Sequence, residues 1–433
     1  MLKNLDLKMK LSNKIQNFLL KDALERFLRY VKIWTTSDTK SASFPSTENQ
    51  LELGKLLSNE LKELNLKNII HDKFGYVYAN LPPSEGFENV KPIGFIAHLD
   101  TSQSVSGKDV KPVIHENYDG KEIFFSQNEE ISLSIADSPQ LNEYIGLDII
   151  TSQGDTLLGA DNKAGIAEIM AACAAWKRFP ELKHGPITIC FTPDEEIGRG
   201  TRKIKKNLLP KNCFTLDGSE MGQLEIECFD AWGASIKFKG LNVHPGYAKN
   251  LMINAIHIAS RFLSNLPEAE SPEHTEEREG FYHLMNLEGN EEEATATLIL
   301  RDFNLKNNQN RMNYLESLKK SYELRYPGLK IELNFLHQYH NMLTFLEKEE
   351  KAIDLAKKAI HFSGLEVKIH SIRGGTDGTK LSEKGIPTPN IFAGGMLFHS
   401  RKEYIPTLAF QKASEVIIYL AELWTEEHNL YNY

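Results

Sequence analysis

Apolar residues recur every three or four positions in several parts of the chain, which is the spacing of one helical face. Residues 22–33 and 47–64 show the pattern, and Ser46 or Thr47 could cap the second of these helices. The same spacing predicts helices that begin at residue 159 or span residues 349–362 and 408–424. Long amphipathic helices therefore open and close the chain.

Short apolar runs separate these helices. Residues 93–97 and 187–192 are apolar on both faces, which is typical of strands buried in a sheet that is covered by helices on both sides. Residues 214–217 form a third such run, which ends in an acid. The alternation of strands and helices predicts an α/β fold with a mixed, mostly parallel sheet and helices on both faces.

The pattern changes in the middle of the chain. Residues 234–240, 294–300 and 330–335 alternate apolar with polar, as in half-exposed antiparallel strands, and helices are predicted over 250–266 and 308–326. We expect a smaller α+β two-layer domain inserted into the larger one. The predicted boundaries are 1–226 for the first part of the larger domain, 227–338 for the insertion and 339–433 for the second part.

Composition narrows the functional classes. The chain has 433 residues, 41% of them hydrophobic and 25% charged, with a net charge of −9. This balance does not suggest nucleic acid or an anionic membrane as a partner. No apolar run reaches the length of about 18 residues that a membrane-spanning helix needs. The four cysteines form no CxxC pair, which favours a cytoplasmic, reducing location, and residues 1–14 predict a short amphipathic helix or a frayed tail.

Five metal-type ligands follow predicted strands or turns. They are His98, Asp161, Glu196, Asp217 and His399. Ligand sites of open α/β sheets lie beyond the carboxyl ends of the strands, so we expect these side chains to converge there. Two imidazoles and three carboxylates suit zinc, or less selectively manganese or cobalt. With two ions, one carboxylate would bridge them.

Each of these residues alone has a plainer explanation. His98 could be an ordinary satisfied histidine, Asp161 a helix cap and Asp217 a turn residue. The order and context of the set favour a metal site. Asp100 lies on the same face of its segment as His98 and could orient the imidazole. Glu195 and Glu196 follow a buried strand, where adjacent like charges are costly unless cations compensate them.

Taken together, the motifs place the chain close to a known family. The segments concerned are 96–101 (IAHLDT), 156–170 (TLLGADNKAGIAEIM), 191–200 (FTPDEEIGRG), 215–218 (TLDG), 242–246 (NVHPG), 299–303 (ILRDF), 372–378 (IRGGTDG) and 398–399 (FH). The chain resembles the peptidase T family of bacterial aminotripeptidases. That family belongs to the co-catalytic di-zinc metallopeptidase superfamily, which also includes carboxypeptidase G and aminoacylase-type enzymes.

The resemblance implies a role for each matching residue. His98 and Asp217 would hold one zinc, Glu196 and His399 the other, and Asp161 would bridge them, with a cis peptide bond after Asp161. It also implies that Asp100 orients His98, that Glu195 is the general base and that His244 from a partner subunit's inserted domain stabilises the oxyanion. Arg373 and Arg301 are candidates for the substrate carboxylate, because a guanidinium binds carboxylate in a bidentate way.

The predicted function is that of a zinc aminopeptidase. A metal-bound hydroxide, formed with Glu195 as base, would hydrolyse the first peptide bond of short peptides, with tripeptides as the expected substrates. The expected cofactors are two zinc ions per subunit, with manganese or cobalt as substitutes, and the inserted domain would act as a lid and dimerisation domain of a homodimer. The family usually has Asp where this chain has Asn162, and the chain begins roughly 20 residues before the family start.

Two other functions stay open at this level. A related amidohydrolase (a dipeptidase, carboxypeptidase or N-acyl amino acid deacylase) would use the same metal site with a different specificity. A metal-dependent binding or scaffold protein without catalysis is the other alternative. The presence of Glu195 argues against the scaffold, because that carboxylate is not needed to hold metal.

Overall fold

The structure is a computed structural model that describes residues 10–430. The first nine residues of the predicted tail over residues 1–14 therefore lie outside the described part. The chain divides into two compact units. The larger unit comprises Met1–Ile226, Phe345–His370 and Thr376–Tyr433, and the smaller unit comprises Glu227–Thr344 and Ser371–Gly375.

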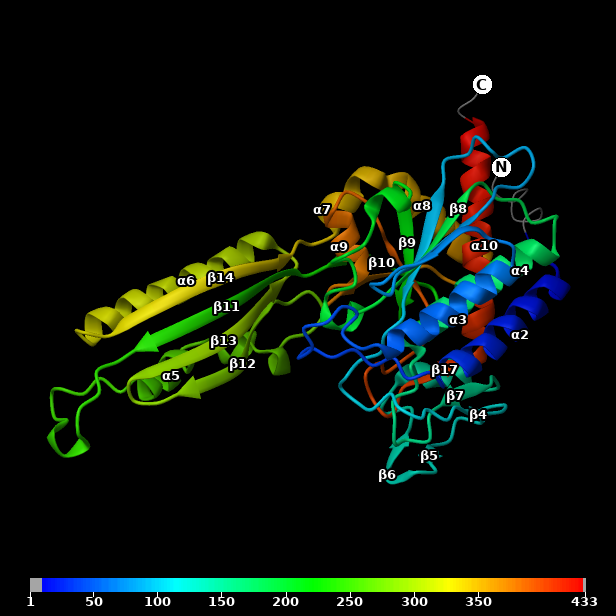
Figure 1. Cartoon of the computed structure of the whole chain (residues 1–433). Helices are drawn as coiled ribbons and strands as arrows, with labels where there is room; N and C mark the ends of the chain where they lie inside the picture. The colour runs from blue at the N-terminus through cyan, green and yellow to red at the C-terminus, as the bar shows by residue number, and fades with distance from the viewer. Residues whose placement is uncertain (1–9, 431–433) are drawn as a thin grey trace. The chain divides into compact units, whose positions relative to one another are not determined.

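An eight-stranded sheet forms the centre of the larger unit, in the order β1-β2-β8-β3-β9-β16-β10-β15 (Figure 1). The neighbouring strands β8, β3, β9 and β16 run parallel, while β1–β2, β2–β8 and β10–β16 pair antiparallel. The predicted mixed α/β sheet is confirmed, and its parallel part is central. The strand bounds are β1 Lys67–His71, β2 Val77–Leu81, β3 Ile93–His98, β8 Ile187–Thr192, β9 Asn212–Gly218, β10 Gln223–Cys228, β15 Lys368–Ile372 and β16 Asn390–Phe392.

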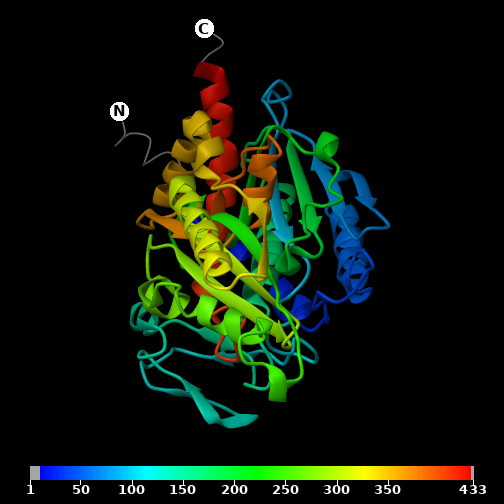
Figure 2. The ribbon, with the colours of Figure 1, turned by 90° about the vertical axis from the view of Figure 1, so that its left-hand side faces the viewer.

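Helices cover both faces of this sheet. On one face, Ile96 of β3 and Cys190 of β8 pack in one cluster with Leu381 of α9. On the other face, Phe214 of β9 lies against Trp424 of α10, with ring centroids 6.2 Å apart. Helix α10 also packs against α2, α4 and α8, and Figure 2 shows α10 (red) beside α8. The helix bounds are α2 Asn13–Tyr30, α3 Asn49–Glu63, α4 Ala160–Arg178, α8 Glu350–Phe362, α9 Asp377–Glu383 and α10 Thr407–Leu430.

Helix α2 begins earlier than the sequence pattern predicted. Ser12 caps it by accepting the N–H of Ile15, and Leu19 is fully buried. The N–H of Leu11 donates to the Tyr419 hydroxyl of α10 at 3.0 Å. The prediction that the helix starts at residue 22 was wrong, because isolated apolar positions among polar residues form a buried stripe only once the neighbouring helices are in place.

The segment between β3 and α4 consists of loops and short strands. Its strands β4 and β7 form a three-stranded sheet with β17 from near the end of the chain, in the order β17-β7-β4, and β5 and β6 form a two-stranded sheet. The bounds are β4 Val113–His115, β5 Ile123–Phe125, β6 Asn128–Leu133, β7 Ile149–Thr151 and β17 Tyr404–Pro406. None of the helices in the described range is both long and apolar enough to cross a membrane.

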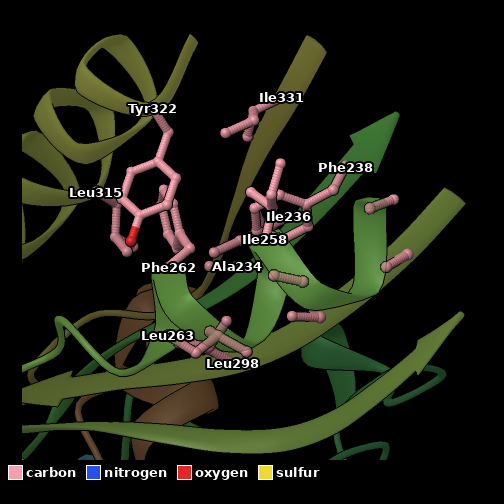
Figure 3. Packing of buried hydrophobic residues seen from close by; sticks show 14 of the residues in the cluster. Ala234, Ile236, Phe238, Ile258, Phe262, Leu263, Leu298, Leu315, Tyr322 and Ile331 are labelled. Carbon is pink, nitrogen blue, oxygen red and sulfur yellow. The ribbon is translucent and has the colours of Figure 1, made fainter. Parts of the chain in front are cut away.

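The smaller unit is a four-stranded antiparallel sheet in the order β12-β13-β11-β14, with α5 and α6 packed against it. Alternate residues of the strands are buried, such as Ile236 and Phe238 of β11, and they form one core with Phe262 of α5 and Tyr322 of α6 (Figure 3). The bounds are β11 Asp230–Lys239, α5 Ala255–Leu263, β12 Phe281–Gly289, β13 Glu293–Asp302, α6 Leu305–Arg325 and β14 Lys330–Tyr339, and the short α7 Leu343–Leu346 spans the boundary between the two units. This is a two-layer α+β unit.

Candidate metal centre

The carboxyl ends of the central parallel strands carry the predicted ligands. His98 is the last residue of β3, and Asp217 lies next to the last residue of β9. Glu195 and Glu196 lie in a single 3-10 turn just after β8. Because these strands are parallel neighbours, their carboxyl ends meet at one edge of the sheet, as the sequence reasoning required.

Two groups of ligand atoms share one carboxylate. In the first group, His98 Nε2 lies 2.8 Å from Asp161 Oδ1 and 3.3 Å from Asp217 Oδ1. In the second group, His399 Nε2 lies 3.0 Å from Asp161 Oδ2 and 2.8 Å from Glu196 Oε2. The two oxygens of Asp161 thus face different groups. Within each group the ligand atoms lie within 4.8 Å of one another, close enough to hold a metal ion.

The loop before α4 presents Asp161 to both groups. The peptide bond between Asp161 and Asn162 is cis, as the family resemblance implied. Asn162 is buried, and no described group hydrogen-bonds its side-chain amide. The Asn162 side chain therefore adds no charge to the site.

The electrostatics of the site fit bound cations. Burial raises the pKa of Glu196 to about 8 and that of Asp217 to about 7, and it raises the pKa of Glu195 well above its usual range. Burial opposes protonation of His399, yet its contacts with Asp161 and Glu196 raise its pKa to about 11. Glu196 Oε1 is buried and has no hydrogen-bond partner among the described residues. Buried carboxylates, and a buried oxygen without a hydrogen-bond partner, are stabilised by nearby positive charge. Two divalent ions would supply that charge.

Asp100 was expected to orient the His98 imidazole through its carboxylate, but its backbone carbonyl lies closer to the ring. The ring nitrogen Nδ1 of His98 lies 3.0 Å from the backbone carbonyl of Asp100 and 3.5 Å from its carboxylate. The Asp100 carboxylate accepts the backbone N–H groups of Glu195 and Glu196, at 2.9 Å and 3.1 Å. It therefore holds the turn that carries both glutamates, in addition to lying close to His98.

Glu403 supports the site although no sequence motif indicated it. This residue is 1% exposed, and its carboxylate accepts the N–H groups of Leu158, Gly159 and Asp161 at 2.8, 2.9 and 3.1 Å. It fixes the loop that carries Asp161, the carboxylate common to both groups. No signal in the sequence marks Glu403, because its three partners lie more than 240 positions away.

Asp377 also had no assigned role, although it lies in the matching segment 372–378. It is 4% exposed, and it accepts a hydrogen bond of 2.6 Å from the Thr192 hydroxyl at the end of β8. Burial raises its pKa to about 6, while Thr192 and His98 act in the opposite direction. Asp377 thus adds a further buried acid to the same edge of the sheet.

The remaining predicted residues lie in the smaller unit. His244 is exposed, and its Nδ1 accepts the N–H of Gly246 at 3.1 Å. Arg301 donates to the carbonyl oxygen of Trp232 at 3.1 Å and to the amide oxygen of Gln338 at 2.7 Å. Both arginines that were candidates for the substrate carboxylate are engaged within this unit.

Arg373 is the second of these arginines. Its guanidinium donates to the carbonyl oxygens of Glu277 and Glu279 at 2.8 and 2.9 Å, and to Thr275. It also lies over the Phe229 ring, 5.2 Å from the centroid. To bind a substrate carboxylate, Arg373 would have to exchange some of these contacts.

The fold and the site together define a class: an α/β protein whose sheet edge holds a candidate dinuclear metal centre with one shared carboxylate. Residues 157–423 match the family described as peptidase family M20/M25/M40. The chain is also 46% identical over 407 residues to "Peptidase T" of Listeria monocytogenes, covering 94% of this chain and 99% of that protein. A "Peptidase T" of Caldanaerobacter subterraneus is 47% identical over 402 residues, with coverage of 93% and 98%. The chain belongs to peptidase family M20/M25/M40.

Solved structures show the same fold. The aminopeptidase PepT of Bacillus cereus superposes with a TM-score of 0.72 at 20% identity, covering 94% of this chain and 98% of that one. A tripeptidase of Staphylococcus aureus gives a TM-score of 0.73 at 19% identity, covering 94% and 99%. A dinuclear metal-binding peptidase of family M20 from Bacillus subtilis gives 0.64 at 16% identity, covering 96% and 99%. These likenesses extend over both units of the chain.

Proposed function

We propose that this chain is a metallo-aminopeptidase that removes the N-terminal residue from short peptides, with tripeptides as the main substrates. The observation that carries the proposal is the pair of ligand groups that share Asp161. The nearly full-length similarity to proteins named Peptidase T supports the substrate class. The expected partners are therefore short peptides with a free α-amine.

Two zinc ions per subunit fit the donor set. His98 and Asp217 would hold one ion, Glu196 and His399 the other, and Asp161 would contribute one oxygen to each. Imidazole and carboxylate ligands suit zinc, and manganese or cobalt could replace it. When bound, such ions lower the pKa of water and polarise a peptide carbonyl.

Glu195 is the proposed general base. Its pKa is raised well above the usual range by burial and by the neighbouring acids Asp217, Asp377 and Glu196, although His98 opposes the shift. A raised pKa makes the ionised carboxylate a stronger base. Asp100 fixes the backbone of Glu195. Glu195 would accept a proton from the attacking water and return it to the leaving amine.

Recognition of the substrate ends is assigned to charged side chains. The acids at the sheet edge would receive the ammonium group of the peptide. Arg301 and Arg373 are the proposed ligands of its carboxylate, since a guanidinium binds carboxylate in a bidentate way. Their present contacts with Gln338 and Thr275 are neutral, and an ionised carboxylate is a stronger acceptor than these groups.

We further propose a homodimer in which the smaller unit serves as lid and dimerisation domain. The partner subunit's His244 would stabilise the oxyanion. The hydrogen bond from Gly246 supports this role, because a neutral imidazole that accepts at Nδ1 carries its proton at Nε2 and can donate there. A cytoplasmic location is proposed as well, supported by four cysteines that are all buried free thiols.

Peptide hydrolysis by the purified chain tests the function. A free tripeptide should be cleaved after its first residue, while the N-acetylated tripeptide should resist because it lacks the α-amine. Preferential cleavage of the acetylated peptide would indicate a deacylase, and release of the C-terminal residue would indicate a carboxypeptidase. The Glu195→Gln variant should keep its metal and lose turnover by roughly 10²–10⁴-fold. If both proteins were inactive with metal bound, a scaffold role would replace the proposal.

A further inference from the structure

The smaller unit contains a separate group of metal-type ligands. Asp230 is the first residue of β11, His337 lies near the end of β14, and His340 follows that strand. One ligand atom from each lies within 4.8 Å of the other two. We propose that these three residues form a third metal site, for zinc or a similar divalent transition ion. The proposal goes beyond the peptidase function, because none of the three belongs to the dinuclear centre.

The distances fit the edges of a coordination tetrahedron. Asp230 Oδ2 lies 3.2 Å from His337 Nε2 and 3.3 Å from His340 Nδ1. With zinc–ligand bonds of about 2.0–2.1 Å, tetrahedral geometry places neighbouring ligand atoms about 3.3–3.4 Å apart. The distance from each imidazole nitrogen to the carboxylate oxygen therefore already matches the spacing of two ligand atoms bound to one zinc ion. One carboxylate with two imidazoles is also a donor set that suits zinc, copper or nickel better than calcium or magnesium.

The other oxygen of Asp230 is held by neighbouring donors. Oδ1 accepts the indole N–H of Trp232 at 2.7 Å and the side-chain amide of Asn308 at 3.2 Å. Asn308 also donates to the backbone carbonyl of Asp230 at 2.7 Å, and both Asp230 and Asn308 are buried. These bonds fix the carboxylate so that Oδ2 faces the imidazoles. Such supporting hydrogen bonds are typical of metal ligands.

An irregularity in β14 brings the two histidines together. Ala231 pairs with Tyr339 and Trp232 with His337, so Gln338 is an extra residue on β14 at this point. In a regular strand, residues three positions apart point to opposite faces. The bulge and the end of the strand at Tyr339 allow His340 to turn toward His337, with ring centroids 3.9 Å apart. Bulges commonly re-aim side chains in this way.

The competing explanation is a simple ion pair between Asp230 and a protonated histidine. An ion pair with Asp230 would stabilise only one of the two histidines well. If both imidazoles were protonated, two positive charges would lie beside each other and repel. A single divalent ion satisfies both nitrogens at once. Arg301 is a nearby cation that will weaken metal binding, because Asp230 also attracts its guanidinium. We therefore expect weaker binding here than at the dinuclear centre.

Exposure leaves room for a fourth ligand. The side chains of His337 and His340 are 22% and 43% exposed, whereas Asp230 is 3% exposed. Three protein ligands with one position open to water form a complete zinc coordination sphere. An ion here would join the beginning of β11 to the end of β14.

Metal counting on the full chain tests the site. The protein is stripped with a chelator, reloaded with zinc or cobalt, freed of excess metal and analysed by elemental mass spectrometry. We expect three equivalents for the wild type and two for the His337→Gln/His340→Gln double variant. His257→Gln is the matched control, since this exposed histidine lies on α5 of the same unit, and it should retain three.

Two further measurements distinguish loss of the metal site from misfolding of the variant. His340→Gln changes the most exposed ligand, so the fold should persist, and it should lower affinity for the third equivalent at least tenfold. In the cobalt protein, the difference spectrum between wild type and double variant should show tetrahedral d–d absorption. Equal metal content in the wild type and the double variant, with both folded, would overturn the proposal and leave Asp230 in an ion pair only. Loss of one equivalent in His257→Gln as well would also overturn it.

Discussion

A substitution of Glu403 tests how the protein positions Asp161, the proposed shared metal ligand. Its carboxylate accepts the N–H groups of Leu158 and Gly159 at Oε2 and that of Asp161 at Oε1. In Glu403→Gln, the amide oxygen can replace only one of the two carboxylate oxygens. If that oxygen keeps Leu158 and Gly159, the amide NH₂ must face the N–H of Asp161, so one hydrogen bond to a charged group is lost.

The expected cost follows from this count. A hydrogen bond to a charged group is worth about 1.5–3 kcal/mol, and the two opposed donors add to the loss. We expect the free energy of unfolding of the metal-free protein to fall by about 2–3 kcal/mol. The substitution disturbs the loop that carries Asp161. Metal affinity should therefore fall roughly 10–100-fold, the usual effect of removing a residue that orients a ligand. Burial raises the pKa of Glu403 to about 7, so at about pH 8.5 the ionised carboxylate of the wild type carries a burial cost that the neutral amide avoids. This offsets part of the loss in the free energy of unfolding, and zinc affinity is therefore the measurement that decides.

Urea unfolding and competitive zinc titration against a chelator measure the two effects. The matched control is Glu415→Gln, a buried glutamate of α10 whose carboxylate bonds to Gln411 and Lys412. That change should affect unfolding without altering zinc affinity. If Glu403→Gln bound both metals as tightly as the wild type, the carboxylate would not position Asp161, and the reasoning would be refuted.

Three further predictions concern other parts of the chain. By elemental analysis, Asp161→Asn should lose both zinc ions of the centre, whereas His399→Gln should lose one. Equal losses in the two variants would contradict the proposal that Asp161 binds both ions. Arg373→Ala removes several hydrogen bonds to residues 275–279 and should raise KM for tripeptides more than it lowers kcat, and an unchanged KM in steady-state assays would exclude a substrate role. Glu60→Ala leaves Arg26 without its interhelical partner and should lower the free energy of unfolding by about 3 kcal/mol in urea with little change in kcat.

The sequence predicted the larger sheet well where burial on both faces made the strands uniformly apolar. Strands β3 and β8 lie within a residue of their predicted bounds. The edge strand β1 was missed because its pattern is weak: all its residues are exposed or half-buried. Helix α9 has seven residues, too short for a periodic signal. Short elements become stable only through contacts that local sequence does not contain.

The ligand residues could be predicted because strand ends are readable from sequence. His98, Asp161, Glu196, Asp217 and His399 are all brought together in the structure. The residues that hold them in place could not be predicted, because their partners are distant in sequence. The pairing of Glu403 with the Asp161 loop and the exact contacts of Asp100 depend on how separate segments pack. The same holds for the cluster of Asp230 with the two histidines of β14.

The central claim is that two metal ions lie on either side of Asp161. A crystal structure of the zinc-loaded protein, with anomalous diffraction collected at the zinc edge, tests it most directly. The account predicts one anomalous peak within bonding distance of His98, Asp161 and Asp217, and another within bonding distance of Asp161, Glu196 and His399. A map without density beside Asp161, in crystals of protein that hydrolyses tripeptides, would contradict the account.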